Sequence, residues 1–191
     1  MTVAASPTPS PAHRPQQLVL LGTGNAHLQV LSQLAAQPLA GAVVTLIAPQ
    51  PRQMVASMLP GLVAGHYTLQ DCVIPLEPLV QRSGIRWIRQ SVIAVNAEQQ
   101  TVQLDDGSTL PFDWLSFNTG PVQDRESVER ALPGAREHAL FIRPAEAFAA
   151  LWPRVAEMGD TRPLRIAVIG AGASGFEMAL AVRHRLPTCA I

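Results

Sequence analysis

A glycine-rich hexapeptide near the end of the sequence, Gly170-Ala171-Gly172-Ala173-Ser174-Gly175, constrains the fold more than any other segment. An apolar run that predicts a strand, Leu164 to Ile169, stands before it, and a helix-like stretch, Phe176 to Leu186, follows it. Glycines at this spacing allow a tight turn, let a pyrophosphate approach the backbone, and let helix and strand pack closely. The N–H groups and the positive dipole end of such a helix attract phosphate. The sequence therefore predicts a dinucleotide site at this turn, with a purely structural strand–helix turn as the alternative.

Residues 18–47 carry the same pattern in a less complete form. Leu18 to Leu21 is a continuous apolar run, typical of a strand buried on both faces, and Gly22-Thr23-Gly24 ends it. Apolar residues from Leu28 to Ala35 then follow at helical spacing, and a second apolar run covers Val43 to Ile47. Strand, helix and strand within about 30 residues predict a right-handed βαβ unit of a parallel sheet.

His27 occupies the position of the third glycine in this first turn. The acidic residue that often holds a ribose is also missing, because no carboxylate stands near Ala48, where the second strand ends. A histidine in the first turn of a helix is most often a capping or solvated side chain. The alternative interpretation is that His27 contacts a phosphate or a ribose.

The predicted elements between the two turns are shorter. Strand-like runs occur at residues 85–88, 91–96, 101–104 and 114–117. With the hairpin signal Asp105-Asp106-Gly107-Ser108, they predict an antiparallel meander that interrupts a parallel α/β frame. Residues 121–138 predict a polar surface excursion, and residues 145–158 predict a helix that Pro153 must bend or break. The Pro-rich residues 1–17 predict a disordered lead.

Composition excludes several classes of protein. The 191 residues carry 14 basic and 14 acidic side chains, so the chain lacks the basic excess that is typical of nucleic-acid binders. All basic residues are arginine, which excludes a P-loop lysine and a Schiff-base lysine. Cys72 and Cys189 form no CxxC pair, and no histidines have metal-ligand spacing, so neither a redox dithiol nor a metal site is predicted. The sequence shows no signal peptide and no membrane-spanning stretch, and we expect a cytoplasmic location.

The arrangement of the two turns resembles a known family. Two glycine-rich strand–helix turns are separated by a meander that ends in Asn118-Thr119-Gly120, which is similar to the alanine-threonine-glycine signature of the pyridine nucleotide-disulfide oxidoreductase superfamily. Asn118 replaces the usual alanine. The segments Ser57 to Gly61 and Ala64 to Tyr67 resemble type II NADH dehydrogenase-like flavoproteins, especially the branch fused to selenide, water dikinase. A histidine in place of the third glycine also suits that branch.

The resemblance implies a three-layer, FAD/NAD(P)-binding Rossmann-like α/β fold, with a parallel sheet, an antiparallel meander and a truncated second dinucleotide-binding domain. It divides the chain into a disordered lead (1–17), the N-terminal part of an FAD-binding domain (18–140), a connecting segment with a helix (141–162), and the first strand and helix of an NAD(P)-binding domain (163–191). The acid that would hold the NAD(P) ribose would fall beyond Ile191.

The resemblance also implies cofactors and site residues. Hydride would pass from NAD(P)H to FAD, and electrons would then pass to a small-molecule acceptor such as a quinone. The expected FAD-binding residues are Gly22, Thr23, Gly24, Asn25, Ala26, His27, Val92, Asn118, Thr119 and Gly120. The expected NAD(P)H-binding residues are Gly170, Gly172, Ala173, Ser174 and Gly175, and Glu177 is the candidate near the hydride-transfer site.

Two other interpretations stay open. The chain could be a truncated, non-catalytic remnant or a dinucleotide-binding module, because its second βα unit is incomplete. It could also attach peripherally to the inner face of a membrane, by analogy with type II NADH dehydrogenases, although no basic amphipathic helix supports this. The sequence leaves the oligomeric state and the choice between NADH and NADPH open.

Overall fold

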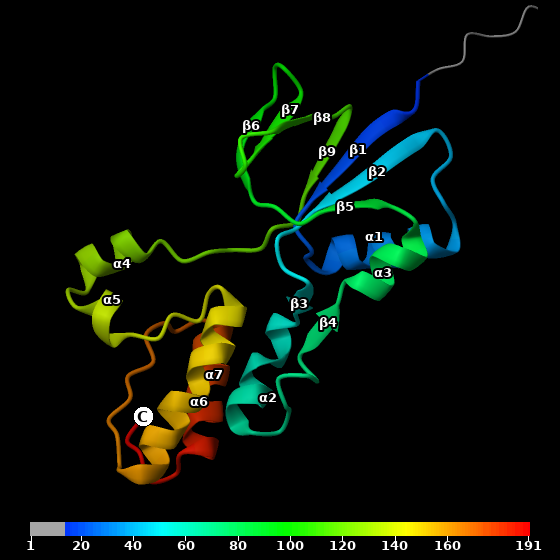
Figure 1. Ribbon diagram of the computed structural model, residues 1–191. Helices are drawn as coiled ribbons and strands as arrows, with labels where there is room; N and C mark the ends of the chain where they lie inside the picture. Colours follow the sequence, from blue (N-terminus) through cyan, green and yellow to red (C-terminus); the bar gives the residue numbers. More distant parts are fainter. Residues whose placement is uncertain (1–13) are drawn as a thin grey trace, which may run out of the picture. The chain divides into compact units, whose positions relative to one another are not determined.

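The computed structural model describes residues 14–191, and these form two compact units (Figure 1). The first unit contains the chain up to Pro51 and Glu77–Thr119. The second unit contains Arg52–Leu76 and Gly120–Ile191. Each unit contains one of the two glycine-rich turns, so each is described by itself.

A four-stranded parallel sheet forms the centre of the first unit. Its strands are β1 (Gln16–Leu21), β2 (Ala42–Ile47), β5 (Arg86–Ile88) and β9 (Trp114–Phe117), in the order β5-β2-β1-β9. Leu21 at the end of β1 is in register with Ile47 and with Phe117. The carboxyl ends of β1, β2 and β9 therefore meet at one edge, which is where parallel α/β sheets bind their ligands.

The sheet is buried on both faces, as the apolar run of β1 predicts. Leu20 and Leu46 face a layer of two helices, α1 (Asn25–Ala36) and α3 (Glu77–Ser83). Val19 and Leu21 pack on the other side against the antiparallel sheet of β6 (Val92–Asn96), β7 (Thr101–Leu104) and β8 (Thr109–Pro111). Helices, parallel sheet and meander give the first unit its three layers (Figure 1).

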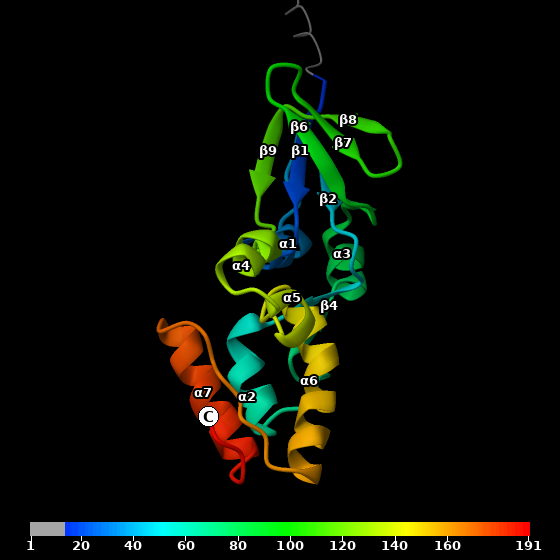
Figure 2. The same ribbon diagram turned by 90° about the vertical axis from the view of Figure 1, so that its left-hand side faces the viewer.

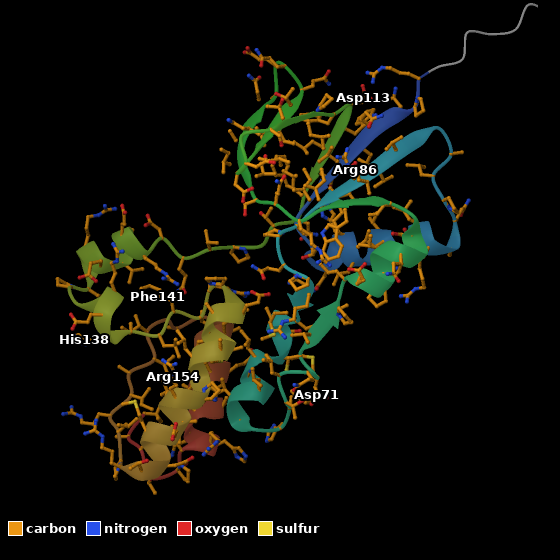
Figure 3. All side chains as sticks on the ribbon, viewed as in Figure 1. Asp71, Arg86, Asp113, His138, Phe141 and Arg154 are labelled. Carbon is orange, nitrogen blue, oxygen red and sulfur yellow. The ribbon has the colours of Figure 1, made fainter. Side chains whose placement is uncertain are left out.

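The meander is shorter than the sequence predicts. Only β6, β7 and β8 pair antiparallel, whereas β5 and β9 join the parallel sheet beside β2 and β1. Asp113 precedes β9 (Figure 3), and its carboxylate accepts hydrogen bonds from the Arg14 guanidinium at 2.6 Å and the Gln17 N–H at 2.7 Å. β1 thus begins at Gln16, inside the lead predicted to be disordered; the first 13 residues of that lead lie outside the described residues.

The second unit is mainly helical. Its core lies between α2 (Leu59–Ala64), α6 (Ala145–Thr161) and α7 (Ala173–Arg185), with α2 packed against both longer helices (Figure 2). A two-stranded antiparallel sheet, β3 (Arg52–Met54) and β4 (Val73–Pro75), adjoins a short 3-10 turn, η1 (Ala56–Met58). Two short helices, α4 (Arg125–Ala131) and α5 (Ala135–His138), occupy the predicted polar excursion.

Helix α6 is continuous through Pro153 and runs on to Thr161, so the proline does not break it. Its buried face, with Phe148, Trp152 and Ala156, packs into the core on both sides of the proline. The predicted strand Leu164–Ile169 does not form. Within residues 14–191 this segment makes only one isolated parallel bridge, between Arg165 and Ala190, and a strand needs a continuous neighbour for its N–H and C=O groups.

No helix within residues 14–191 is long and apolar enough to cross a membrane.

Candidate functional site

The first glycine-rich turn leaves the end of β1 and enters α1 at the carboxyl edge of the sheet. Gly22 has φ +80°, a conformation that favours glycine, and its N–H donates to the Ile47 carbonyl of β2 at 2.9 Å. A Cβ on Gly22 would lie 2.6 Å from the Asn118 carbonyl oxygen and 2.6 Å from Thr119 Cα. The turn therefore requires glycine here because the chain leaving β9 passes directly against it.

Backbone hydrogen bonds of Asn118 connect this turn to the end of β9. The Gly24 N–H donates to the Asn118 carbonyl at 2.9 Å, and the Asn118 N–H donates to the Leu21 carbonyl at 2.8 Å. A Cβ on Gly24 would overlap Asn118 Oδ1, so the Asn118 carboxamide covers one side of Gly24. The structure thus brings together Gly22, Gly24, Asn118 and Thr119 of the predicted FAD-binding set.

The first turn of α1 supplies donors without an acceptor. α1 has no side-chain cap and no acidic residue in its first turn, so the N–H groups of Asn25 and Ala26 have no acceptor within the helix. The positive end of the helix dipole is likewise not compensated there. Such a turn can hold an anionic group such as a pyrophosphate.

His27 is not solvated, and that interpretation of the sequence is wrong. The side chain is only 2% exposed. Nδ1 lies 2.7 Å from the Gly22 carbonyl oxygen, and Nε2 lies 2.9 Å from Ser116 Oγ on β9. His27 therefore connects the glycine turn to the neighbouring strand from inside the unit.

Three other residues of the predicted FAD-binding set are placed differently. Thr23 is buried within the turn. Val92 begins β6 in the meander, where it pairs with Leu104. Gly120, with φ +77°, is the first residue of the second unit.

The second glycine-rich turn enters α7 in the second unit. Gly170 has φ +130°, and Gly172 is the N-cap of α7 with φ −76°. Nothing lies within 4 Å of a Cβ built on Gly172, so one side of the turn is open. A Cβ on Gly175 would overlap the Gly170 carbonyl oxygen, so close packing requires glycine at the third position.

The predicted residues around this turn lie at the surface. Ala173 and Ser174 are exposed in the first turn of α7, which has no side-chain cap and no acidic residue. Glu177 lies one turn further along α7 and is also exposed. This second turn therefore offers the same set of backbone donors as the first.

The described residues contain neither a cluster of metal-ligand side chains nor a disulfide. No group of three or more His, Cys, Asp or Glu side chains within residues 14–191 could hold a metal ion. Cys72 and Cys189 are free and buried. Burial raises the pKa of the Cys72 thiol, which disfavours the reactive thiolate.

Sequence reasoning missed Ser116. It lies in the short apolar run Trp114–Phe117 and holds Nε2 of His27, whose sequence position is 89 residues away. A serine inside an apolar strand is the one signal that could have indicated a buried polar partner.

Comparison with known proteins places these features in a wider group. The pattern that describes the pyridine nucleotide-disulphide oxidoreductases matches residues 16–186. Among curated relatives, demethylphylloquinone reductase from Synechocystis is 28% identical over 179 residues, which is 89% of this chain and 43% of that protein. The type II NADH:quinone oxidoreductase of Staphylococcus saprophyticus is 26% identical, over 90% of this chain and 44% of that protein.

Solved structures show the same fold. The sulfide:quinone oxidoreductase of Aquifex aeolicus matches with a TM-score of 0.68 at 20% identity, over 91% of this chain and 42% of that one. A water-forming NADH oxidase from Lactobacillus brevis, bound to NADH, matches with a TM-score of 0.67 at 19% identity, over 90% and 38%. The chain spans less than half the length of these proteins. The predicted FAD/NAD(P)-binding Rossmann-like fold is confirmed.

Proposed function

Because this chain belongs to the pyridine nucleotide-disulphide oxidoreductase family, we propose that it binds FAD at the first glycine-rich turn and NAD(P)H at the second. We further propose that it serves in hydride transfer from the nicotinamide to the flavin. The family predicted from Asn118-Thr119-Gly120 and the two turns is thereby confirmed. The closer resemblance to the branch fused to selenide, water dikinase stays a prediction.

The observation that carries the proposal is the pair of turns with matching geometry. Each follows an extended segment and opens an uncapped helix, with a glycine of positive φ at its first position. Two such turns in one chain provide for two dinucleotides, since the first N–H groups of each helix have no acceptor within the helix and can donate to a phosphate.

The first turn fits the pyrophosphate of FAD. The N–H groups of Asn25 and Ala26 would donate to phosphate oxygens, while Gly22 and Gly24 keep the backbone close to them. The Gly24 N–H is already bonded to Asn118, so it would hold the turn and not the cofactor. The Asn118 carboxamide beside Gly24 would add a polar group at the same place.

The second turn fits the pyrophosphate of NAD(P)H. The open side of Gly172 leaves room for a phosphate at the end of α7, and the N–H groups of Ala173 and Ser174 would donate to it. When bound, the two cofactors would supply the hydride donor and the hydride acceptor. The part of this chain is to bind and orient them, with Glu177 as the residue that we place near the reacting rings.

A quinone is the acceptor that the relatives favour. Two curated relatives are named as a demethylphylloquinone reductase and an NADH:quinone oxidoreductase, and a third as a sulfide-quinone reductase. A quinone acceptor would place the protein at a membrane surface, for which we propose the cytoplasmic inner face. Because the chain spans less than half of these relatives, the acceptor belongs to the proposal for the whole protein.

An absorption titration tests the proposal. The 191-residue chain is mixed with FAD, freed of unbound FAD by gel filtration, and then given NADH without oxygen. Retained flavin bands that bleach with NADH would support both sites. A double variant, Gly22→Val with Gly24→Val, provides the control and should lose the flavin, since a side chain at either position meets Asn118. Absence of retained flavin in the unchanged chain would contradict the FAD site.

A second candidate function is a module that binds a dinucleotide without turnover. The specific observation is the exposed apolar surface of the second unit, where Ile169, Phe176 and Leu180 are 74%, 66% and 56% exposed beside a segment with one strand bridge. The first unit can then bind a dinucleotide at its turn, while the loosely paired second unit leaves the second turn inactive. Flavin bands that stay unbleached after NADH would favour this candidate.

A further inference from the structure

We propose that His27 is a positioning residue of the FAD site, which holds the first glycine-rich turn against β9 through two partly buried hydrogen bonds. This inference rests on the proposed function of the first turn as an FAD site. It assigns to His27 a role through the turn, and not a direct contact with a phosphate or a ribose.

The geometry assigns one tautomer to the ring. The Gly22 carbonyl can only accept, so Nδ1, at 2.7 Å, carries the proton and donates it. In the neutral ring Nε2 then has a free lone pair and accepts from the Ser116 hydroxyl at 2.9 Å. With both ring nitrogens engaged and the residue 2% exposed, the His27 side chain has no donor left for a cofactor.

The second turn shows what His27 replaces. There the third glycine, Gly175, lies so close to the Gly170 carbonyl that a Cβ would overlap its oxygen. At the first turn the equivalent carbonyl, that of Gly22, meets the imidazole of the third-position residue instead. The bulky His27 is thus accommodated where glycine is expected, because its side chain donates a hydrogen bond to the Gly22 carbonyl and does not clash with it.

These contacts fix the turn on both sides. The Gly22 N–H is bonded to Ile47 of β2, and its carbonyl is held through His27 to Ser116 of β9. The backbone N–H groups in the first turn of α1 are therefore oriented before any ligand binds. If the link to β9 were lost, the turn would hold its binding conformation for only a fraction of the time, and the FAD dissociation constant would rise in proportion.

Three variants of the 191-residue chain test this role, with FAD as the probe and fluorescence quenching as the readout. Losing both hydrogen bonds in His27→Phe should raise the FAD dissociation constant about tenfold. His27→Asn retains a donor near the position of Nδ1, so the rise should be only about threefold. Ser116→Ala leaves the bond to Gly22 and should also raise the constant about threefold.

Ser83→Ala is the matched control. The Ser83 hydroxyl is buried in the same unit and donates to the Val80 carbonyl at 2.9 Å, far along the chain from the turn. It should lower the melting temperature about as much as Ser116→Ala does, with an FAD dissociation constant within about twofold of the unchanged chain. An unchanged FAD affinity in His27→Phe, or an equal loss in Ser83→Ala, would overturn the inference.

A second measurement needs no bound cofactor. Nitrogen-15 NMR of the imidazole should show the proton on Nδ1, and His27→Phe should speed hydrogen exchange at the Gly24 amide about tenfold. If the unchanged chain binds no FAD, the proposed function of the first turn fails, yet these signals still report whether His27 holds the turn. The other tautomer, or an unaltered exchange rate, would overturn the positioning role itself.

Discussion

Substitution by alanine should affect stability at Gly175 but not at Gly172. At Gly175 a Cβ would overlap the Gly170 carbonyl oxygen and lie 2.8 Å from its carbon. Both are backbone atoms, so no side-chain rotation can relieve the clash. At Gly172 nothing lies within 4 Å, and its φ of −76° with ψ of 174° is ordinary for alanine.

The expected magnitudes follow from these contacts. For Gly175→Ala, α7 must shift by about 1.5 Å before the contact with Gly170 becomes ordinary. Overpacking costs about 1–3 kcal/mol, and a backbone-to-backbone clash belongs in the upper half of that range. The better helix propensity of alanine offsets about 1 kcal/mol. The net loss of about 1–2 kcal/mol should lower the melting temperature by roughly 2–8 °C.

For Gly172→Ala the two stability effects nearly cancel. The weaker N-cap costs about 0.5 kcal/mol, and the stiffer unfolded chain returns a similar amount. The melting temperature should therefore stay within about 2 °C. Binding should nevertheless suffer, since the new methyl group enters the open side of the turn. Loss of one charge-assisted hydrogen bond to phosphate would weaken NADH binding about tenfold.

The assay pairs thermal denaturation with NADH titration of both variants and the unchanged chain. Gly172→Ala should separate the two readouts, and Gly175→Ala should change both. A Gly172→Ala variant that melts as early as Gly175→Ala would refute the open space at Gly172. One that keeps full NADH affinity would refute the second turn as a pyrophosphate site.

Three further results are expected. Gly24→Ala should destabilise the chain, and by less when Asn118→Ala is also present, because the Asn118 carboxamide fills the space that the new Cβ needs; additive changes in melting temperature would argue against this contact. Hydrogen bonds from Arg185 lower the pKa of Asp160 below its ordinary value of 3.8, so Asp160→Asn should lower the melting temperature at neutral pH. The difference in melting temperature between the unchanged chain and Asp160→Asn should vanish only as the pH falls through the lowered pKa. Melting curves from pH 7 to pH 2 would check this, and a difference that persists at pH 2 would contradict it. Glu177→Gln should slow NADH-dependent bleaching several-fold with little change in the melting temperature, and an unaltered rate would remove Glu177 from the reacting centre.

The sequence predicts the first βαβ unit well because its signals are local. Leu18 to Leu21 reads as a strand buried on both faces, and Leu20 and Leu21 are indeed buried against different layers. The direction of β9 was not predictable in the same way. Apolar periodicity is the same in parallel and antiparallel strands, so only its pairing with β1 shows that Trp114–Phe117 belongs to the parallel sheet.

The sequence predictions that fail in the second unit do so for a different reason. Leu164–Ile169 has the composition of a strand, but strand formation depends on neighbours, and the described residues supply only Ala190. The hydrogen bonds of Ala190 to Leu164 and Ile166 are parallel in sense, which is how a βαβ unit begins. At Pro153 the local signal fails in the other direction. The proline predicts an interrupted helix, but the packing of α6 against the core outweighs the local penalty of a proline.

The role of His27 depends on contacts that no local pattern contains. One of its partners lies five residues away and the other 89, so the hydrogen bond to Ser116 exists only once β9 lies beside β1. The glycine motif describes one solution to a packing problem, which is the removal of a side chain next to the first carbonyl of the turn. A second solution is a side chain that bonds to that carbonyl, provided that the neighbouring strand supplies a partner for its other end. An imperfect glycine motif should therefore be judged together with the strand beside it, and in this chain Ser116 is the residue that makes His27 acceptable.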